Sequence, residues 1–448
     1  MKGAPRRQQT VRRFAQPLLR NGIPLALLAS IIAYGLLAYR YQWQAPRNLS
    51  PAKLIFASSV DSPPARLETI LTIVCLLLLA ALACLYGLLA YHYRWLPYRI
   101  ARSLKLLWFS TPKGVPTDVE SLISIQTPAD VLQMRQRLCQ FLWEQPDTPR
   151  AILPASVAPA NDARWDFLAA SVRQVDDVLF EMEFGLTSHV YHFIPTQPTD
   201  RLVLFHAGHE GDFIAQKTVI KKLLDQNIAV AAFAMPLLGL NSQPEVQLSR
   251  FGNLKLTSHD QMKLLDPKVG HPVKFFIEPV VGFLNYAAQL GYQQISMLGM
   301  SGGGWTTIVA AAVETRIKTS MHVAGAYPMF LRVGRDDWGD WEQTVPEFYR
   351  EANYLELFIL GAHGPGRMQC QIVNRYDPTC FAGDGWKTYA VNVQEHVAAL
   401  GEGVWDIFVD ESHFEHIVSD LALRKFLEIV NTNATSSPTS QPRPTTLI

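Results

Sequence analysis

The stretch QISMLGMSGGGWTTIVAAAV, residues 294–313, decides the fold that this chain is expected to adopt. An apolar run ends at Gly299, the motif Gly-Met-Ser-Gly-Gly follows, and a helix-like apolar run begins directly after it. A G-x-S-x-G motif between a strand and a helix is typical of a tight turn that lifts the serine hydroxyl clear of the backbone. The helix that begins there points the positive end of its dipole at the same place. Ser301 is therefore predicted to be a nucleophile.

A serine hydroxyl needs a histidine to take its proton and an acid to orient that histidine. When the serine lies on such a turn, the acid and the histidine follow it in the chain, each after a later strand. The predicted strand Gln369–Val373 leads into Asp377, the expected acid. The predicted strand Trp405–Val409 leads into two histidines, His413 and His416. We expect His416 to be the base because it precedes the last helix-like run, and His413 is the alternative.

From residue 187 onward, short β-branched runs alternate with longer amphipathic runs, which indicates a mostly parallel sheet with crossover helices. The predicted strands are His189–Ile194, Leu202–His206, Ala229–Ala234, Ile295–Leu298, Ser320–Ala324, Gln369–Val373 and Trp405–Val409. The predicted helices cover residues 213–226, 272–290, 303–313, 386–400 and 415–430. The fold class is therefore α/β.

The order Ser301, Asp377, His416 in such a sheet resembles the α/β-hydrolase superfamily over about residues 187–430. The resemblance implies an oxyanion hole made by the backbone N–H of Gly302 and by a donor from the loop after residues 202–206, where Gly208 and His209 are the candidates. It implies a serine hydrolase that cleaves a carboxylic ester or thioester through an acyl-enzyme intermediate, without a dissociable cofactor. An amidase or an acyltransferase with the same triad, and a non-catalytic scaffold that kept the fold, are the alternatives.

The loop after residues 202–206 also raises the question of a metal site, because His206, His209 and Asp212 are spaced three apart. A zinc site needs three or four ligands held in a fixed geometry. These residues cross a strand-to-helix junction, where a spacing of three does not bring side chains onto one face. No metal is therefore predicted.

The segment 328–367 is longer than a simple connection and is predicted to be a cap insertion. Its aromatic residues would either line a substrate pocket or pack against the domain; they are Phe330, Trp338, Trp341, Phe348, Tyr349, Tyr354 and Phe358.

Two runs without charged residues, 21–39 and 69–93, are each long enough to cross a bilayer as a helix. Lys and Arg are denser in residues 1–20 and after residue 93 than in the 40–68 loop, so the loop is predicted to be extracytoplasmic and the catalytic domain cytoplasmic. The chain is thus expected to be a two-pass membrane protein with a lipid bilayer as partner. Residues 94–186 are predicted to be a connector with helical pieces, one of them around 127–145, and residues 431–448 a disordered tail.

The composition of the chain argues against several classes of partner and site. Of the 448 residues, 48% are hydrophobic and 18% are charged, with a formal net charge of +1. Residues 94–448 carry more acidic than basic side chains, which argues against a nucleic-acid partner. Five scattered cysteines do not form a disulfide framework or a zinc motif. A small-molecule or lipid-derived ester is the expected substrate, whereas the oligomeric state does not follow from the sequence.

Overall fold

The computed structural model describes residues 63–92, 115–160, 162–211, 213–333 and 338–436. The chain divides into two compact units, Met1–Arg102 and Ser103–Ile448. The described part of the first unit is one helix, α3 (Pro63–His92), which contains all but the last residue of the predicted run 69–93. The other predicted span, 21–39, and most of the 40–68 loop lie outside the described residues.

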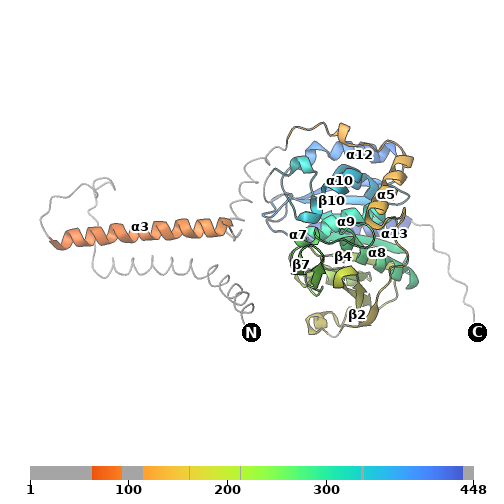
Figure 1. Cartoon of the computed structure of the whole chain (residues 1–448), viewed down its shortest axis with the longest axis horizontal. Helices are drawn as coiled ribbons and strands as arrows, with labels where there is room; N and C mark the ends of the chain where they lie inside the picture. The colour runs from red at the N-terminus through yellow and green to blue at the C-terminus, as the bar shows by residue number, and fades with distance from the viewer. Residues whose placement is uncertain (1–62, 93–114, 161, 212, 334–337, 437–448) are drawn as a thin grey trace, which may run out of the picture. The chain divides into compact units, whose positions relative to one another are not determined.

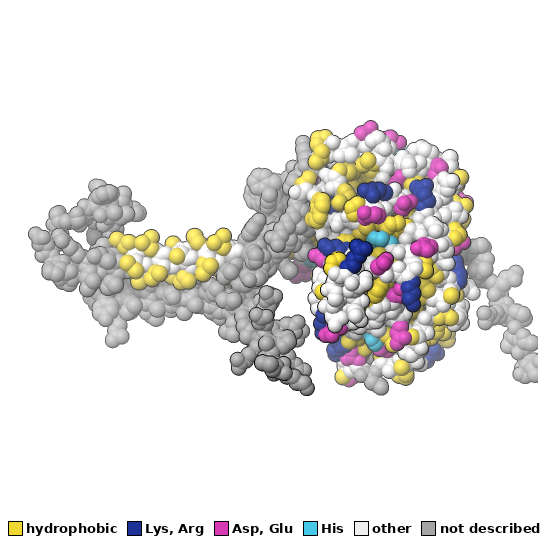
Figure 2. Space-filling model, in the orientation of Figure 1, with side chains coloured by type: hydrophobic (Ala, Val, Ile, Leu, Met, Phe, Trp, Pro, Cys, Tyr) yellow, Lys and Arg dark blue, Asp and Glu magenta, His cyan; other side chains and the backbone are white. Residues whose placement is uncertain are grey.

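Helix α3 exposes large apolar side chains along its described length, as the hydrophobic surface in Figure 2 shows; they are Ile73, Val74, Leu76, Leu77, Leu78, Leu82, Leu85 and Leu88. Within the described residues, no helix combines the length and apolar composition that a membrane crossing requires.

The second unit is built around one sheet, to which nine strands of the described residues belong, in the order β1-β2-β3-β5-β4-β8-β9-β10-β11. The parallel part consists of β5 (Ala229–Phe233), β4 (Arg201–His206), β8 (Gln294–Met300), β9 (Thr319–Val323), β10 (Met368–Asn374) and β11 (Val404–Asp410). The strand β3 (Thr187–Pro195) joins it antiparallel to β5. Each of the seven predicted strands is confirmed, with no end shifted by more than two residues.

The sheet begins earlier in the chain than predicted. Strands β1 (Ser156–Pro159) and β2 (Val172–Glu181) extend the sheet beyond β3 in antiparallel pairs, although residues 94–186 were expected to be a connector. They were missed because β1 is exposed along its whole length and β2 carries four charged residues, so neither forms the continuous apolar run of a buried parallel strand. A hairpin of β6 (Glu245–Leu248) and β7 (Gly252–Lys255) was also missed.

Helices cover both faces of the sheet (Figure 1), and their buried side chains fall into separate core clusters. One face is covered by α6 (Lys217–Leu224) and α13 (Asp420–Ser436), which share a core cluster with the central strands. The other face is covered by α8 (Lys274–Gln289), α9 (Gly302–Val313) and α12 (Ala390–Ala399), with α5 (Pro128–Trp143) packed on α9. All five helix regions predicted beyond residue 187 are therefore occupied by helices, and α5 confirms the helical piece around 127–145.

The segment 328–367 is only partly an insertion. Its first part contains irregular chain and α10 (Pro346–Glu351), but α11 (Tyr354–Ala362) is fully buried and packs against α9 and β10 as an ordinary layer of the fold. Phe348, Tyr354 and Phe358 are buried in the core. For these three aromatic residues, the packing interpretation holds instead of the pocket interpretation.

The last helix also differs from its prediction. α13 begins at Asp420 instead of residue 415 and continues to Ser436, into the predicted disordered tail. The acidic residue in its first turn, Asp420, lies where a helix start favours negative charge. Residues 437–448 lie outside the described part of the chain.

Candidate active site

Ser301 occupies the turn between β8 and α9, as the sequence predicts. Its backbone has φ +56° and ψ −121°, a conformation that non-glycine residues rarely adopt, and its N–H donates to the carbonyl of Val323 at 2.8 Å. A Cβ on Gly303 would lie 2.2 Å from the carbonyl oxygen of His206, and one on Gly299 would lie 2.1 Å from the carbonyl oxygen of Gly303. The turn therefore has no room for side chains beside the serine, which is the physical reason for the two outer glycines of the motif.

Asp377 and His416 form a close pair. His416 Nδ1 lies 2.7 Å from Asp377 Oδ2, and the Asp377 side chain is completely buried. The other oxygen, Oδ1, accepts the backbone N–H groups of Thr379 at 2.7 Å and Cys380 at 3.3 Å. These bonds fix the carboxylate in the turn after β10. The arrangement is that of an acid that orients a histidine through Nδ1 and directs Nε2 elsewhere.

The other histidine, His413, contacts a different carboxylate. His413 Nε2 lies 3.5 Å from Asp410 Oδ2, and His413 Nδ1 accepts the backbone N–H of Glu415 at 3.1 Å. Burial opposes ionisation of Asp410, but hydrogen bonds from His413, Ser412 and Ser419 hold the pKa of Asp410 well below its usual range. His413 thus belongs to a second buried network and not to the Asp377 pair.

His416 was expected at the start of the last helix, and this reason for preferring it is wrong. The pairing of His416 with Asp377 is nevertheless the one expected of the base. His416 does not stand at a helix start, because α13 begins only at Asp420. Its loop is held instead by Asn374, whose side-chain amide donates to the carbonyl of Ile417 at 3.0 Å and to Asp377 Oδ2 at 3.4 Å. Since β8, β10 and β11 are parallel, the turns that carry Ser301, Asp377 and His416 all leave the same edge of the sheet.

The candidate oxyanion residues Gly208 and His209 lie against the serine turn. A Cβ on Gly208 would be 2.6 Å from Ser301 Cβ, so the backbone of the β4–α6 loop passes directly over the serine. A Cβ on Gly302 would be 2.4 Å from Cε1 of His209, so the imidazole covers the first residue of α9. The loop therefore packs against the start of α9, where the first N–H groups of a helix have no acceptor within the helix itself.

Gly208→Ala is expected to lower kcat for ester hydrolysis by about 10²- to 10³-fold, the cost of losing one oxyanion donor. The added methyl would meet Ser301 Cβ at 2.6 Å and the carbonyl oxygen of Met300 at 2.7 Å, so the loop must move away. Steady-state kinetics on the folded variant measure the effect. Gly385→Ala is the matched control, because its methyl would meet only ordinary contacts at 3.4 Å and beyond. A Gly208→Ala enzyme with wild-type kcat would remove this loop from the oxyanion hole.

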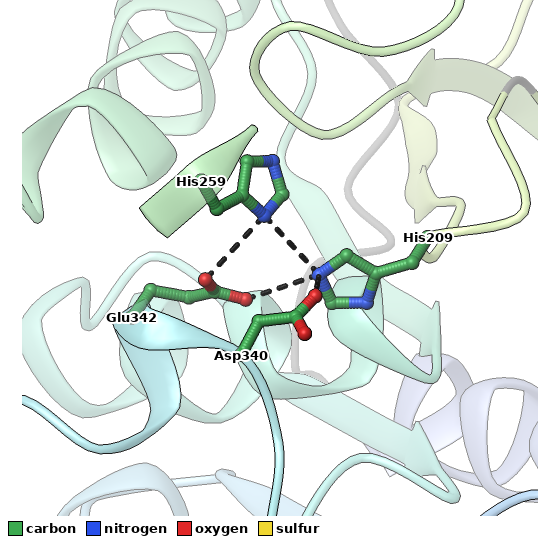
Figure 3. Close-up of side chains that lie close together, drawn as sticks. All are labelled: His209, His259, Asp340 and Glu342. Atoms are coloured by element: carbon green, nitrogen blue, oxygen red, sulfur yellow. Dashed lines mark hydrogen bonds and ion pairs between the residues drawn. The ribbon is translucent and has the colours of Figure 1, made fainter. Parts of the chain in front are cut away.

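Four titratable side chains gather beside this loop, and sequence analysis named only one of them. His209 meets His259 of α7 (His259–Met262) and the carboxylates Asp340 and Glu342, as Figure 3 shows. Burial alone would lower the pKa of His209, but the two carboxylates raise it to about 10. Burial alone would raise the pKa of Glu342, but the two histidines lower it to about 2. The residues come from three separate segments, so no spacing in the sequence could have indicated them.

The other two residues that were weighed as metal ligands do not join this cluster. His206 is buried, with Nδ1 2.8 Å from the carbonyl oxygen of Ala207, and desolvation lowers its pKa to about 4. Asp212 lies outside the described residues.

Comparison with known proteins gives matches among solved structures alone: no family model and no curated protein matches the chain. One similar structure is acetyl xylan esterase 1 from Thermoanaerobacterium sp. JW/SL YS485, with a TM-score of 0.50 and 13% identity over 72% of this chain and 99% of that chain. Another is an acetyl xylan esterase from Paenibacillus sp. R4, with a TM-score of 0.45 and 14% identity over 73% of this chain and 98% of that chain. Together with the sheet order, the first similarity shows that the chain has an α/β-hydrolase fold.

Proposed function

We propose that the chain is a serine hydrolase that cleaves a carboxylic ester or thioester through an acyl-enzyme intermediate. Ser301 is the nucleophile, His416 the general base and Asp377 the residue that orients it. The observation that carries the proposal is the 2.7 Å contact of His416 Nδ1 with the buried Asp377, at the sheet edge from which Ser301 also projects.

The reaction follows from these positions. His416 Nε2 takes the hydroxyl proton as Ser301 Oγ attacks the carbonyl carbon, and the resulting oxyanion is stabilised by the N–H of Gly302 and a donor from the Gly208–His209 loop. His416 then gives the proton to the leaving alcohol or thiol. Water, activated by the same histidine, releases the acid and regenerates the serine.

The experiment that tests this function uses the full-length chain, a fluorophosphonate probe and a panel of 4-nitrophenyl esters of graded acyl length. A competent enzyme should label at Ser301 and hydrolyse at least one ester. Because the structural neighbours are named as acetyl xylan esterases, acetyl esters are the first substrates to try. A folded protein that neither labels nor turns over any ester would favour the non-catalytic scaffold, and turnover of amides or transfer to an added alcohol would favour the amidase or acyltransferase.

Membrane attachment with a cytoplasmic catalytic domain forms the second part of the proposal. It is supported by the uncharged runs 21–39 and 69–93 and by the distribution of Lys and Arg around them.

We expect the full-length protein to stay in the membrane fraction after an alkaline carbonate wash, with a reporter fused after Ile448 active in the cytoplasm. Two uncharged runs that cross the bilayer would bury enough apolar surface to resist extraction, whereas an electrostatically bound protein is released by this wash. Deletion of residues 1–93 is the control and should release the protein. Release of the full-length chain would contradict the anchor, and a reporter active only outside the cytoplasm would reverse the orientation.

A further inference from the structure

The cluster at His209, His259, Asp340 and Glu342 has the composition of a metal site. The atoms that face one another are His209 Nε2, His259 Nδ1 and one oxygen from each carboxylate, all within 4.8 Å. His209 Nε2 lies 2.8 Å from Asp340 Oδ2, 3.1 Å from Glu342 Oε1 and 3.3 Å from His259 Nδ1. Two imidazoles and two carboxylates are a donor set that suits divalent transition metals.

A hydrogen bond at Nε2 of His259 orients its Nδ1 toward the cluster, where it could bind a cation. His259 Nε2 lies 2.8 Å from the carbonyl oxygen of Pro236, which can only accept, so Nε2 carries the proton. In the neutral ring, Nδ1 then presents a lone pair to His209 Nε2 and to Glu342 Oε2 at 3.4 Å. A histidine held by a backbone carbonyl on one nitrogen and facing other donors with the second is the usual outer-shell arrangement of a metal ligand.

Glu342 supplies a second, independent observation that favours a cation at this place. Its side chain is completely buried, and among the described residues Oε2 has no hydrogen-bond partner, with His259 Nδ1 lying 3.4 Å away. This oxygen faces the cluster, where Figure 3 shows it opposite His259. A buried carboxylate oxygen without a partner is costly unless a positive charge compensates it.

A divalent ion would balance the charge of the cluster. With both imidazoles neutral, one divalent cation balances the two carboxylates completely. Burial of charge is tolerated where the charges are paired.

The spacing is also suitable. Tetrahedral zinc with bonds of about 2.0–2.1 Å separates its ligand atoms by about 3.3 Å. The three distances from His209 Nε2, 2.8 Å to Asp340 Oδ2, 3.1 Å to Glu342 Oε1 and 3.3 Å to His259 Nδ1, are close to this value.

We propose that His209, His259, Asp340 and Glu342 bind one divalent transition-metal ion, for which Zn²⁺ is the probe.

The site would join three segments next to the serine turn. His209 belongs to the β4–α6 loop that covers Gly302, His259 to α7, and the two carboxylates to the start of the 338–367 segment. A pocket of about 240 Å³ lined by His209, His259 and Asp340 gives an ion access from solvent. The ion would hold the oxyanion loop in place and take no part in bond making, which makes it a positioning element.

The test is metal analysis of the full-length protein in detergent, which does not depend on hydrolysis. The chain is stripped with a chelator, dialysed against Zn²⁺ and then against metal-free buffer, and its zinc is measured by mass spectrometry. We expect about one Zn²⁺ per chain, a rise in Tm on adding Zn²⁺, and visible absorption bands of four-coordinate Co²⁺ after substitution.

Asp340→Asn is the decisive variant because the side chain is half exposed and the change removes a charge without altering its shape. We expect it to weaken Zn²⁺ binding by at least about 10- to 100-fold, since even outer-shell changes cost that much. His259→Ala is a second ligand variant. His396→Ala is the control, because His396 lies outside the cluster, with Nε2 2.9 Å from Glu120 and Nδ1 3.2 Å from the carbonyl oxygen of Ile125, so this variant should bind Zn²⁺ like the wild type.

Two results would overturn the proposal: folded wild-type protein without stoichiometric zinc, or an Asp340→Asn variant with unchanged affinity. Either would show that the cluster is a metal-free ion network in which protonated His209 links the two carboxylates. Because zinc binding and ester turnover are measured separately, this outcome would leave the proposed hydrolase function standing, and loss of the hydrolase function would leave the metal site standing.

Discussion

Ser301→Ala is expected to lower kcat for ester hydrolysis by about 10⁶-fold and to abolish fluorophosphonate labelling. The change removes the one oxygen that can bond to the acyl carbon, while the methyl group fits where the serine Cβ already stands. The turn depends on the glycines at 299 and 303 and on the backbone bond to Val323, none of which the substitution touches. The variant should therefore fold and keep its Tm.

The matched control for this prediction is Ser320→Ala on β9. Ser320 is almost completely buried, and among the described residues its hydroxyl accepts one hydrogen bond, from the side-chain amide of Gln369 at 3.4 Å. That variant should label and turn over like the wild type. If folded Ser301→Ala protein hydrolyses esters at an appreciable rate, Ser301 is not the nucleophile and the proposed mechanism fails.

The central strands could be predicted from the sequence because parallel strands are buried on both faces and form continuous apolar runs. Residues Leu202–His206 and Ala229–Phe233 are completely or almost completely buried. Strand β2 could not be predicted in this way, since Arg173, Asp176 and Asp177 interrupt its apolar positions. One half-exposed edge of the sheet was therefore assigned to a connector.

The site was predictable to the extent that it depends on local sequence. Ser301 is marked by the glycines that its turn requires, and Asp377 by its place just after a strand. The choice between His413 and His416 depends on which carboxylate each ring meets, and that is a tertiary property. The cluster of His209, His259 and Glu342 is a stronger example, because its members come from three segments and only the folded chain brings them together.

His416→Ala is expected to lower kcat about as much as Ser301→Ala, by about 10⁶-fold, because a serine without its base is hardly more reactive than a free alcohol. His416 is the histidine whose Nδ1 meets the buried Asp377 at 2.7 Å. His413→Ala removes a 3.5 Å contact with Asp410, whose carboxylate keeps its hydrogen bonds from Ser412 and Ser419. Its loss should cost no more than about 10- to 100-fold, as an outer-shell change does.

Steady-state kinetics on both variants, each checked for Tm, decide between the two histidines. The double variant Ser301→Ala/His416→Ala adds a test of the mechanism itself: residues that act as one unit are not additive, so the double variant should be hardly slower than either single variant. The double variant Ser301→Ala/His413→Ala should have the same kcat as Ser301→Ala, since no route through the serine remains for the second change to impair. If His413→Ala is inactive while His416→Ala keeps appreciable kcat, the base is His413, and Asp410 takes the role proposed for Asp377.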